Sequence, residues 1–203
     1  AAEANARNFY GAATRAVIGD GGNWIGPLGE THFPGWTQIL DFLHLLVHGY
    51  AAAGCAFPES GGRAWTLYHE LLCWSWSGRV DEVLRRLEHH QARIGSAPAG
   101  AKENDPREIL RRVIKYVRDN RTRMDYPAYR MAGLPVTRAL VESLIKQINQ
   151  RVKGTEKFWS EARVEAVLRC RAAHLSQDDR AERHFANRPL GRAVGQRRLR
   201  NAS

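Results

Sequence analysis

The stretch TRAVIGDGG at residues 14–22 decides the fold that we expect for this chain. A short apolar run with β-branched residues, closed by a glycine-rich turn, is the pattern of a buried strand. Asp20 is then expected at the carboxyl end of this strand, among glycines that leave its carboxylate accessible to a metal ion. An ordinary turn aspartate is the commoner use of such a segment, so the local sequence leaves both interpretations open.

After this strand the pattern changes from extended to helical. Residues 37–41 begin with strand-forming side chains and predict a second strand. From Phe42 to Ile94 apolar residues recur at three- and four-residue spacing, which predicts three amphipathic helices in a row. The segment 96–104 contains a proline and a glycine and is expected to be a loop.

Further helices are expected toward the carboxyl end. Asp105 is followed by a proline and, three residues after Asp105, by a glutamate, which together predict a capped helix start. That helix should end before the connection at 126–135, which contains two prolines. Thr137 is a suitable cap for the next helix, which carries Glu142 just off its apolar stripe. A last helix is expected at about residues 160–175.

The composition fits one globular domain with an inserted subdomain, because 43% of the 203 residues are hydrophobic. The cysteines Cys55, Cys73 and Cys170 are odd in number and far apart, which argues against a disulfide framework and a cysteine zinc site. No amino-terminal segment resembles a secretion signal, and the most apolar stretch, residues 39–47, is too short to span a bilayer. We therefore expect a soluble, cytoplasmic protein without membrane contact.

The charge is strongly positive: 31 Lys plus Arg against 21 Asp plus Glu give a formal net charge of +10. A field of this sign attracts polyanions, so nucleic acid is the leading partner. A solvated basic surface without a nucleic-acid ligand is the alternative. Residues 177–203 combine many arginines with few apolar side chains, and we expect this tail to be largely extended or disordered and to bind phosphates in a salt-sensitive way.

Four motifs follow one another along nearly the whole chain. They are G-D-G-x-x-W-I at 19–25, F-P-G-x-T-Q-I-L-D-F-x-H at 33–44, R-M-x-Y-P-x-Y-R-x-x-G-L-P at 123–135 and V-E-S-x-x-K-Q at 141–147. Each motif alone is weak, but four in this order are hard to obtain by chance. Together they resemble DDE-type transposases of bacterial insertion sequences, of the Kra type related to Mutator-like elements.

The resemblance implies an α/β fold, mainly helical, with a ribonuclease-H-like core that is incomplete at its amino end and interrupted by an α-helical insertion. The core would comprise residues 1–47 and 136–176, the insertion residues 48–135 and the basic tail residues 177–203. The implied function is metal-dependent DNA cleavage and strand transfer, with Mg²⁺ or Mn²⁺ as cofactor and the element ends and target DNA as partners. Homo-oligomerisation is left open, and a location at the bacterial nucleoid would fit.

The family's catalytic metals are held by two aspartates and a glutamate. The resemblance implies that Asp20 is the second of these acids and Glu142 the third, and that both converge on one cation pocket. From the local sequence alone, Glu142 is more simply an early-turn glutamate that complements the helix dipole. The residues before Asp20 include no aspartate. We therefore expect the first acid to lie upstream, and this chain to be inactive alone.

The residues Asp41 and His44 match the family's D-x-x-H element, which we assign to shaping the site or to contacting DNA. A structural aspartate and a satisfied histidine at a strand-to-helix junction are an equally good explanation. His48, four residues after His44, would complete a two-histidine metal face. A simple packing role for His48 is the favoured alternative.

Contacts with DNA are expected on the helix of Glu142, where Lys146, Asn149 and Lys153 form a polar stripe; a solvated helix face is the alternative. Three tryptophans of the insertion are of a type that stacks on bases, although core packing is the simpler expectation. They are Trp65, Trp74 and Trp76. Two other functions stay open: a catalytically inactive transposase remnant that only binds DNA, and a helical interaction protein whose charge is incidental.

Overall fold

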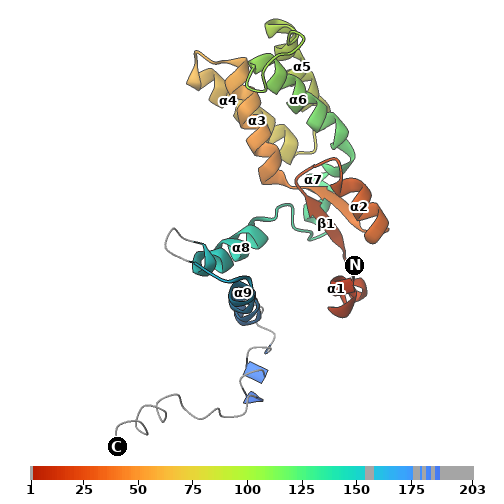
Figure 1. Ribbon diagram of the computed structural model, residues 1–203. Coiled ribbons are helices and arrows are strands. Elements are labelled where there is room, and N and C mark those ends of the chain that lie inside the picture. Colours follow the sequence, from red (N-terminus) through yellow and green to blue (C-terminus); the bar gives the residue numbers. More distant parts are fainter. Residues whose placement is uncertain (1, 154–157, 176–178, 180–181, 184–185, 188–203) are drawn as a thin grey trace, which may run out of the picture. The chain divides into compact units, whose positions relative to one another are not determined.

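The computed structural model describes residues 2–153, 158–175, 179, 182–183 and 186–187 (Figure 1). The chain divides into two compact units, Ala1–Ala139 and Leu140–Ser203. The predicted basic tail at 177–203 lies almost entirely outside the described residues. Within the described ranges, every helix is too short or too polar to cross a membrane.

Two short strands form a parallel pair in the first unit. β1 (Ala16–Gly19) pairs with β2 (Thr37–Leu40), and Gly19 lies opposite Leu40 at the end of the pair. Both predicted strands are therefore confirmed. Parallel neighbours need a crossover, which here contains helix α2 (Ile25–His32). The sequence did not predict α2, because two glycines and a proline within eight residues weaken the helical pattern.

Four helices pack together beyond the strands in this part of the described chain. They are α3 (Phe42–Ala56), α4 (Gly61–Trp76), α5 (Val80–Ile94) and α6 (Pro106–Asp119). Helix α3 contacts both α4 and α6, while α5 packs on α6 (Figure 1). The predicted helices between residues 42 and 94 and the capped helix after Asp105 are confirmed. Asp105 Oδ1 accepts a hydrogen bond from the Arg107 N–H at 2.9 Å.

The strands and these helices share one hydrophobic core. Its buried members come from β2, from α3 to α6 and from the segment after α6, and the half-buried Ile18 of β1 packs against them. The largest buried side chains include Ile39, Leu40, Leu67, Leu87, Leu110, Met124 and Tyr126. Because β2 and the helices bury one common surface, much of the segment 48–135 folds together with residues 1–47.

The connection at 126–135 contains a short helix, α7 (Tyr126–Met131). Helix α6 ends before this connection, as predicted. Pro127 does not prevent α7, because it lies in the first turn, where a backbone N–H is not required. Tyr126 is fully buried and donates a hydrogen bond to the Leu40 carbonyl at 3.0 Å, which fixes α7 against β2.

The second unit contains most of α8 (Ala139–Val152) and all of α9 (Glu161–Leu175), as the sequence predicted. The predicted cap of α8 is confirmed, because Thr137 Oγ1 accepts a hydrogen bond from the Ala139 N–H at 3.2 Å. Three short elements complete the described chain: α1 (Ala2–Ala6), η1 (Phe9–Gly11) and η2 (Arg121–Arg123). The described chain is thus mainly helical with two parallel strands, which confirms the α/β class, while a ribonuclease-H-like topology stays a prediction.

Candidate functional site

Asp20 directly follows β1, and Asp41 directly follows β2. Because Gly19 and Leu40 are paired at the ends of parallel strands, the two aspartates come next to each other in register. The Asp41 N–H donates a hydrogen bond to the Gly19 carbonyl at 2.8 Å. The carboxyl ends of parallel strands are where α/β proteins usually place ligand-binding groups. The strand pair therefore brings two carboxylates to one edge of the sheet.

The Asp20 carboxylate is half-buried and makes one hydrogen bond within the described chain: Oδ1 accepts from the Gly22 N–H at 3.1 Å. No lysine or arginine of the described residues forms an ion pair with it. Its charge is therefore available to a hard cation, which prefers carboxylate oxygens. Asp20 fits as one metal ligand. However, the described residues contain no group of three or more His, Cys, Asp and Glu side chains that could hold a metal ion.

Helix α6 holds the turn that carries Asp20. Tyr116 Oη donates to the Asp20 carbonyl at 2.8 Å, and Asn120 Nδ2 donates to the Gly21 carbonyl at 3.4 Å. Burial and, secondly, the Asp20 charge raise the pKa of Tyr116 well above its ordinary value, so the phenol remains a donor. Neither donor was predicted from the sequence, because 96 and 99 positions separate them from their partners and no local pattern marks them.

We expect Gly21→Ala to destabilise this turn by about 2 kcal/mol, through left-handed backbone strain and a steric clash. Gly21 has a φ of 83°, and an added Cβ would lie 2.6 Å from Tyr116 Cε2 and 2.8 Å from Leu40 Cδ1. Urea unfolding measures the free energy of unfolding. The control is Gly26→Ala in α2, where an added Cβ has no neighbour within 4 Å. An equal effect of the two substitutions would contradict the strain at Gly21.

Arg123 is a cation whose guanidinium lies against the end of β1. Its Nη1 donates to Asn120 Oδ1 at 2.9 Å, whereas Nε and Nη2 are buried and have no hydrogen-bond partner in the described structure. A Cβ added at Gly19 would lie 3.3 Å from Nη2. A positive charge therefore lies beside the residue that precedes Asp20. The motif at 123–135 contains this arginine, but no role for it was predicted from the sequence.

Asp41 is 2% exposed and is bound from two sides. Oδ1 accepts hydrogen bonds from the N–H groups of Leu43 at 2.9 Å and His44 at 3.4 Å, which caps α3. Oδ2 accepts from the backbone N–H and from Nε of Arg138, both at 3.1 Å. Burial alone would raise the pKa of Asp41, but the hydrogen bonds outweigh burial and lower it. These contacts are those of a structural aspartate, and a direct role in the site stays a prediction.

His44 and His48 lie on successive turns of α3, with ring centroids 5.2 Å apart. The His48 ring also packs on Tyr116, at a centroid distance of 4.1 Å. Burial, followed by the charges of His44 and Arg112, lowers the pKa of His48. A neutral His48 therefore packs between α3 and α6, next to the side chain that holds Asp20. Metal binding by the two histidines stays a prediction.

Glu142 lies in the first turn of α8, as predicted. Lys146 and Asn149 follow on the same helix, and the Lys153 N–H donates to the Asn149 carbonyl at 2.7 Å, so the helical path continues to Lys153. The predicted polar stripe therefore exists on α8. Its contact with DNA, and the convergence of Glu142 with Asp20, stay predictions.

The three tryptophans of the predicted insertion differ in exposure. Trp74 packs against the core, as expected, but Trp65 is 60% and Trp76 40% exposed. The Trp76 ring lies between Phe42, at a centroid distance of 5.0 Å, and the Arg130 guanidinium, whose carbon is 3.8 Å from the centroid. The expectation of core packing is therefore right for Trp74 and wrong for Trp65, whose ring is largely solvent-exposed.

The chain was compared with protein-family models, with curated proteins and with solved structures. None of the three comparisons found a match. The assignment of a function therefore depends on the residues, motifs and contacts described above.

Proposed function

We propose that this chain is the carboxyl-terminal catalytic part of a DNA transposase with a ribonuclease-H-like core, which cuts and joins DNA strands with the help of divalent metal ions. The observation that carries the proposal is Asp20, a carboxylate without an ion pair among the described residues, at the carboxyl end of a parallel strand. The four ordered motifs and the net charge of +10 support it.

Mg²⁺ or Mn²⁺ is the cofactor that this function requires. Two such ions would activate the attacking hydroxyl and stabilise the leaving oxygen at phosphorus. Asp20 would supply one carboxylate and Glu142 another, and the hydrogen bonds from Tyr116 and Asn120 keep the turn of Asp20 in place. Asp41 is less suited as a ligand, because both of its oxygens already accept hydrogen bonds from the protein.

The partners in this proposal are the element ends and the target DNA, bound in the bacterial cytoplasm at the nucleoid. The polar stripe Lys146, Asn149 and Lys153 would contact phosphates near Glu142, and the arginines at 177–203 would add contacts without base specificity. Homo-oligomerisation would allow two element ends to be held together. An inactive remnant that binds DNA without cutting it is the second candidate, favoured by the absence of a three-ligand metal group among the described residues.

Iron-directed cleavage tests the convergence of Asp20 and Glu142 on one ion. Fe²⁺ replaces Mg²⁺ at carboxylate sites, and with ascorbate and peroxide it cuts the nearby backbone. We expect cuts around residues 19–22 and 140–144, both suppressed by excess Mg²⁺ and both lost in Asp20→Asn and in Glu142→Gln. Glu88→Gln is the control, because Glu88 pairs with Arg118 on the helices α5 and α6. Cuts at only one of the two segments would overturn the shared site.

Strand transfer tests the activity itself. In the intact protein with Mg²⁺, Asp20→Ala and Glu142→Ala should each reduce the joining of a DNA 3′-hydroxyl to a plasmid to background, because each removes charge and geometry from the metal site. Glu88→Ala should keep the activity. Strand transfer that persists in either Asp20→Ala or Glu142→Ala would remove the assignment of that residue.

A further inference from the structure

Helix α3 runs away from the strands, and its carboxyl-terminal end lies at the far end of the helical bundle (Figure 1). Basic side chains contact Phe57, the residue that follows α3. Helix α3 begins beside Asp41 at the strand ends and runs for 15 residues to Ala56, which at 1.5 Å per residue is about 22 Å. Phe57 follows it as the C-cap. The basic cluster therefore lies on the same unit as Asp20 but well away from it.

Two arginines hold their guanidinium groups over the ring of Phe57. The guanidinium carbon of Arg63, from the first turn of α4, lies 4.3 Å from the ring centroid, and that of Arg93, from the last turn of α5, lies 5.8 Å from it. The ring of His90 meets Phe57 edge-on at a centroid distance of 5.0 Å, and His89 lies next to His90. We call Phe57, Arg63, His89, His90 and Arg93 the Phe57 cluster.

The arginines of the Phe57 cluster form no ion pair with a carboxylate of the described residues. By contrast, Glu70 of α4 is paired with Arg86 of α5 at 3.0 Å. Both arginines are exposed. A stacked guanidinium uses its face against the ring and keeps its N–H edges for other acceptors. Two such groups at one ring offer N–H donors to anionic oxygens.

The buried His90 is affected by the positive charges of the same cluster. It is 2% exposed, and its Nε2 has no hydrogen-bond partner in the described structure. Burial and, after it, the charges of Arg86, Arg93, His89 and Arg63 together lower the pKa of His90 to about 4. Several positive charges in one region of the surface favour the binding of an anion there.

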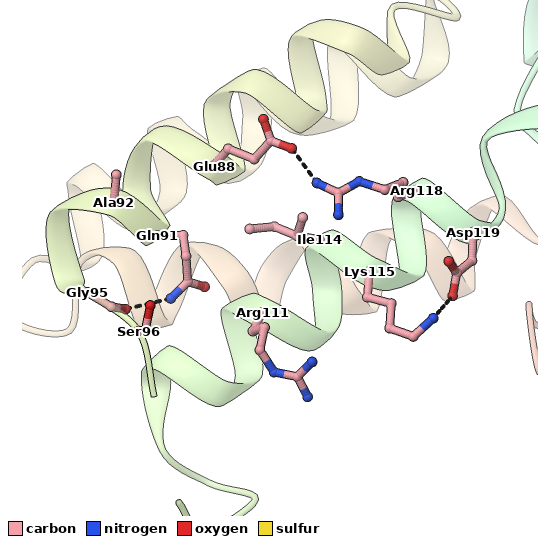
Figure 2. A pocket seen from close by; sticks show the side chains of 10 residues that line it. All are labelled: Glu88, Gln91, Ala92, Gly95, Ser96, Arg111, Ile114, Lys115, Arg118 and Asp119. Atoms are coloured by element: carbon pink, nitrogen blue, oxygen red, sulfur yellow. Dashed lines mark hydrogen bonds and ion pairs between the residues drawn. The ribbon is translucent and has the colours of Figure 1, made fainter. Parts of the chain in front are cut away.

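The open groove between α5 and α6 provides a contrast. It has a volume of about 660 Å³ and is lined by Arg111, Lys115 and Arg118, so it is also rich in cations (Figure 2). Each of these cations, however, pairs with an acid. Lys115 bonds Asp119 and Arg118 bonds Glu88, as Figure 2 shows, and Arg111 bonds Glu108. An anion in this groove would have to compete with three existing ion pairs, whereas the Phe57 cluster offers guanidinium groups without such partners.

We propose that the Phe57 cluster binds the phosphate backbone of duplex DNA, with Arg63 and Arg93 each contacting a phosphate and Phe57 orienting both guanidinium groups. This inference rests on the proposed function in DNA transposition. Arginine forks match phosphate oxygens in bidentate geometry. Phosphate contacts position a duplex and carry no base information, so this surface should bind DNA of any sequence.

The test compares two double variants with equal changes in net charge. Arg63→Gln with Arg93→Gln removes the two unpaired guanidinium groups, and Arg111→Gln with Arg118→Gln removes two paired ones. Fluorescence anisotropy with a labelled random-sequence duplex gives the affinity at several salt concentrations. The first variant should bind about tenfold or more weakly, with a slope of log K against log salt shallower by roughly 2, and the second should resemble the wild type.

A second measurement needs no variant and so is independent of folding defects. Phenylglyoxal modifies accessible arginines, and mass spectrometry locates the adducts in the wild-type chain. Duplex DNA should protect Arg63 and Arg93 but not Arg85, which is exposed on the same helix α5 as Arg93. Modification of Arg63 and Arg93 that DNA leaves unchanged would overturn the proposal.

The remaining outcomes separate this inference from the proposed function. Equal loss of affinity in both double variants, or none in either, would overturn the Phe57 cluster alone. Tighter binding of a duplex RNA than of DNA would overturn the choice of DNA as the partner. If iron-directed cleavage does not cut both segments but DNA protects Arg63 and Arg93, the proposed metal site is overturned and the proposed DNA-binding surface is supported. If the wild type binds no duplex at all, both fall.

Discussion

Asp41→Ala should lower the free energy of unfolding of the first unit by about 3 kcal/mol, the order expected when one partner of a buried ion pair is removed. Asp41 accepts hydrogen bonds from the backbone of Leu43, His44 and Arg138 and from the Arg138 guanidinium. Alanine would remove the cap of α3 and leave these donors without an acceptor. Urea unfolding followed by circular dichroism measures the loss.

Two variants give this prediction its controls. Asp41→Asn keeps an acceptor oxygen but not the charge, so it should lose roughly half as much stability as Asp41→Ala. Asp81→Ala removes an exposed partner of Arg121 and should change the free energy of unfolding by less than about 1 kcal/mol. If Asp41→Ala behaves like Asp81→Ala, the structural role that we give to Asp41 is wrong.

The pH dependence of this contribution has a definite sign. The pKa of Asp41 is lowered in the folded state, so the unfolded state takes up the proton first on acidification. The stabilisation is present above the unfolded pKa of 3.8 and is lost as the pH falls through the lower folded value. The difference in stability between the wild type and Asp41→Ala should therefore narrow only below about pH 4.

The elements that the sequence predicted are those with a local signal. The run that ends at Gly19, the strand that starts at Thr37 and the Asp105 cap are each specified by residues close to them in the chain. Helix α2 has no such signal, because its glycines and proline disfavour a helix. It forms where Gly29 packs against β2: a Cβ at Gly29 would lie 2.5 Å from Gln38 Oε1. This close approach depends on tertiary structure.

The candidate site was predictable only in part, for the same reason. Glycines around Asp20 marked it locally, but its supports, Tyr116 and Asn120, come from a helix almost one hundred positions later. Arg138 reaches Asp41 across 97 positions. Contacts between residues so far apart in the sequence are determined by tertiary packing, so no local sequence pattern predicts them.

The hydrogen bonds from Tyr116 and Asn120 to the turn of Asp20 bear on the predicted helical insertion. The resemblance implies that residues 48–135 interrupt a core formed by other segments. In the structure, α6 lies within residues 48–135 and holds the turn of Asp20, and the side chains of α3 to α6 share the core of β2. Whether or not residues 48–135 are an insertion, α6 is a structural support of the candidate site. Damage to α6 is therefore expected to disturb Asp20 without any contact with a metal or with DNA.

Acidification should destabilise the first unit through His90. The unfolded histidine takes up a proton below its ordinary pKa of 6.5, whereas the folded one does so only near 4. The stability contributed by neutral His90 is therefore lost as the pH falls from 6.5 to about 4, and the loss at pH 4 should be about 3 kcal/mol. Urea midpoints measured across this range give the loss.

His90→Phe should remove this part of the pH dependence, because it keeps a ring of similar size beside Phe57 and has no titratable nitrogen. It should be at least as stable as the wild type at pH 7, since the unpartnered Nε2 disappears. His89→Gln is the control, because His89 is exposed and its removal should leave the acid sensitivity in place. Duplex DNA at Arg63 and Arg93 would weaken the field that opposes protonation and so raise the pKa of His90. If the free energy of unfolding of His90→Phe falls between pH 6.5 and 4 as much as that of the wild type, His90 is not the cause of the acid sensitivity.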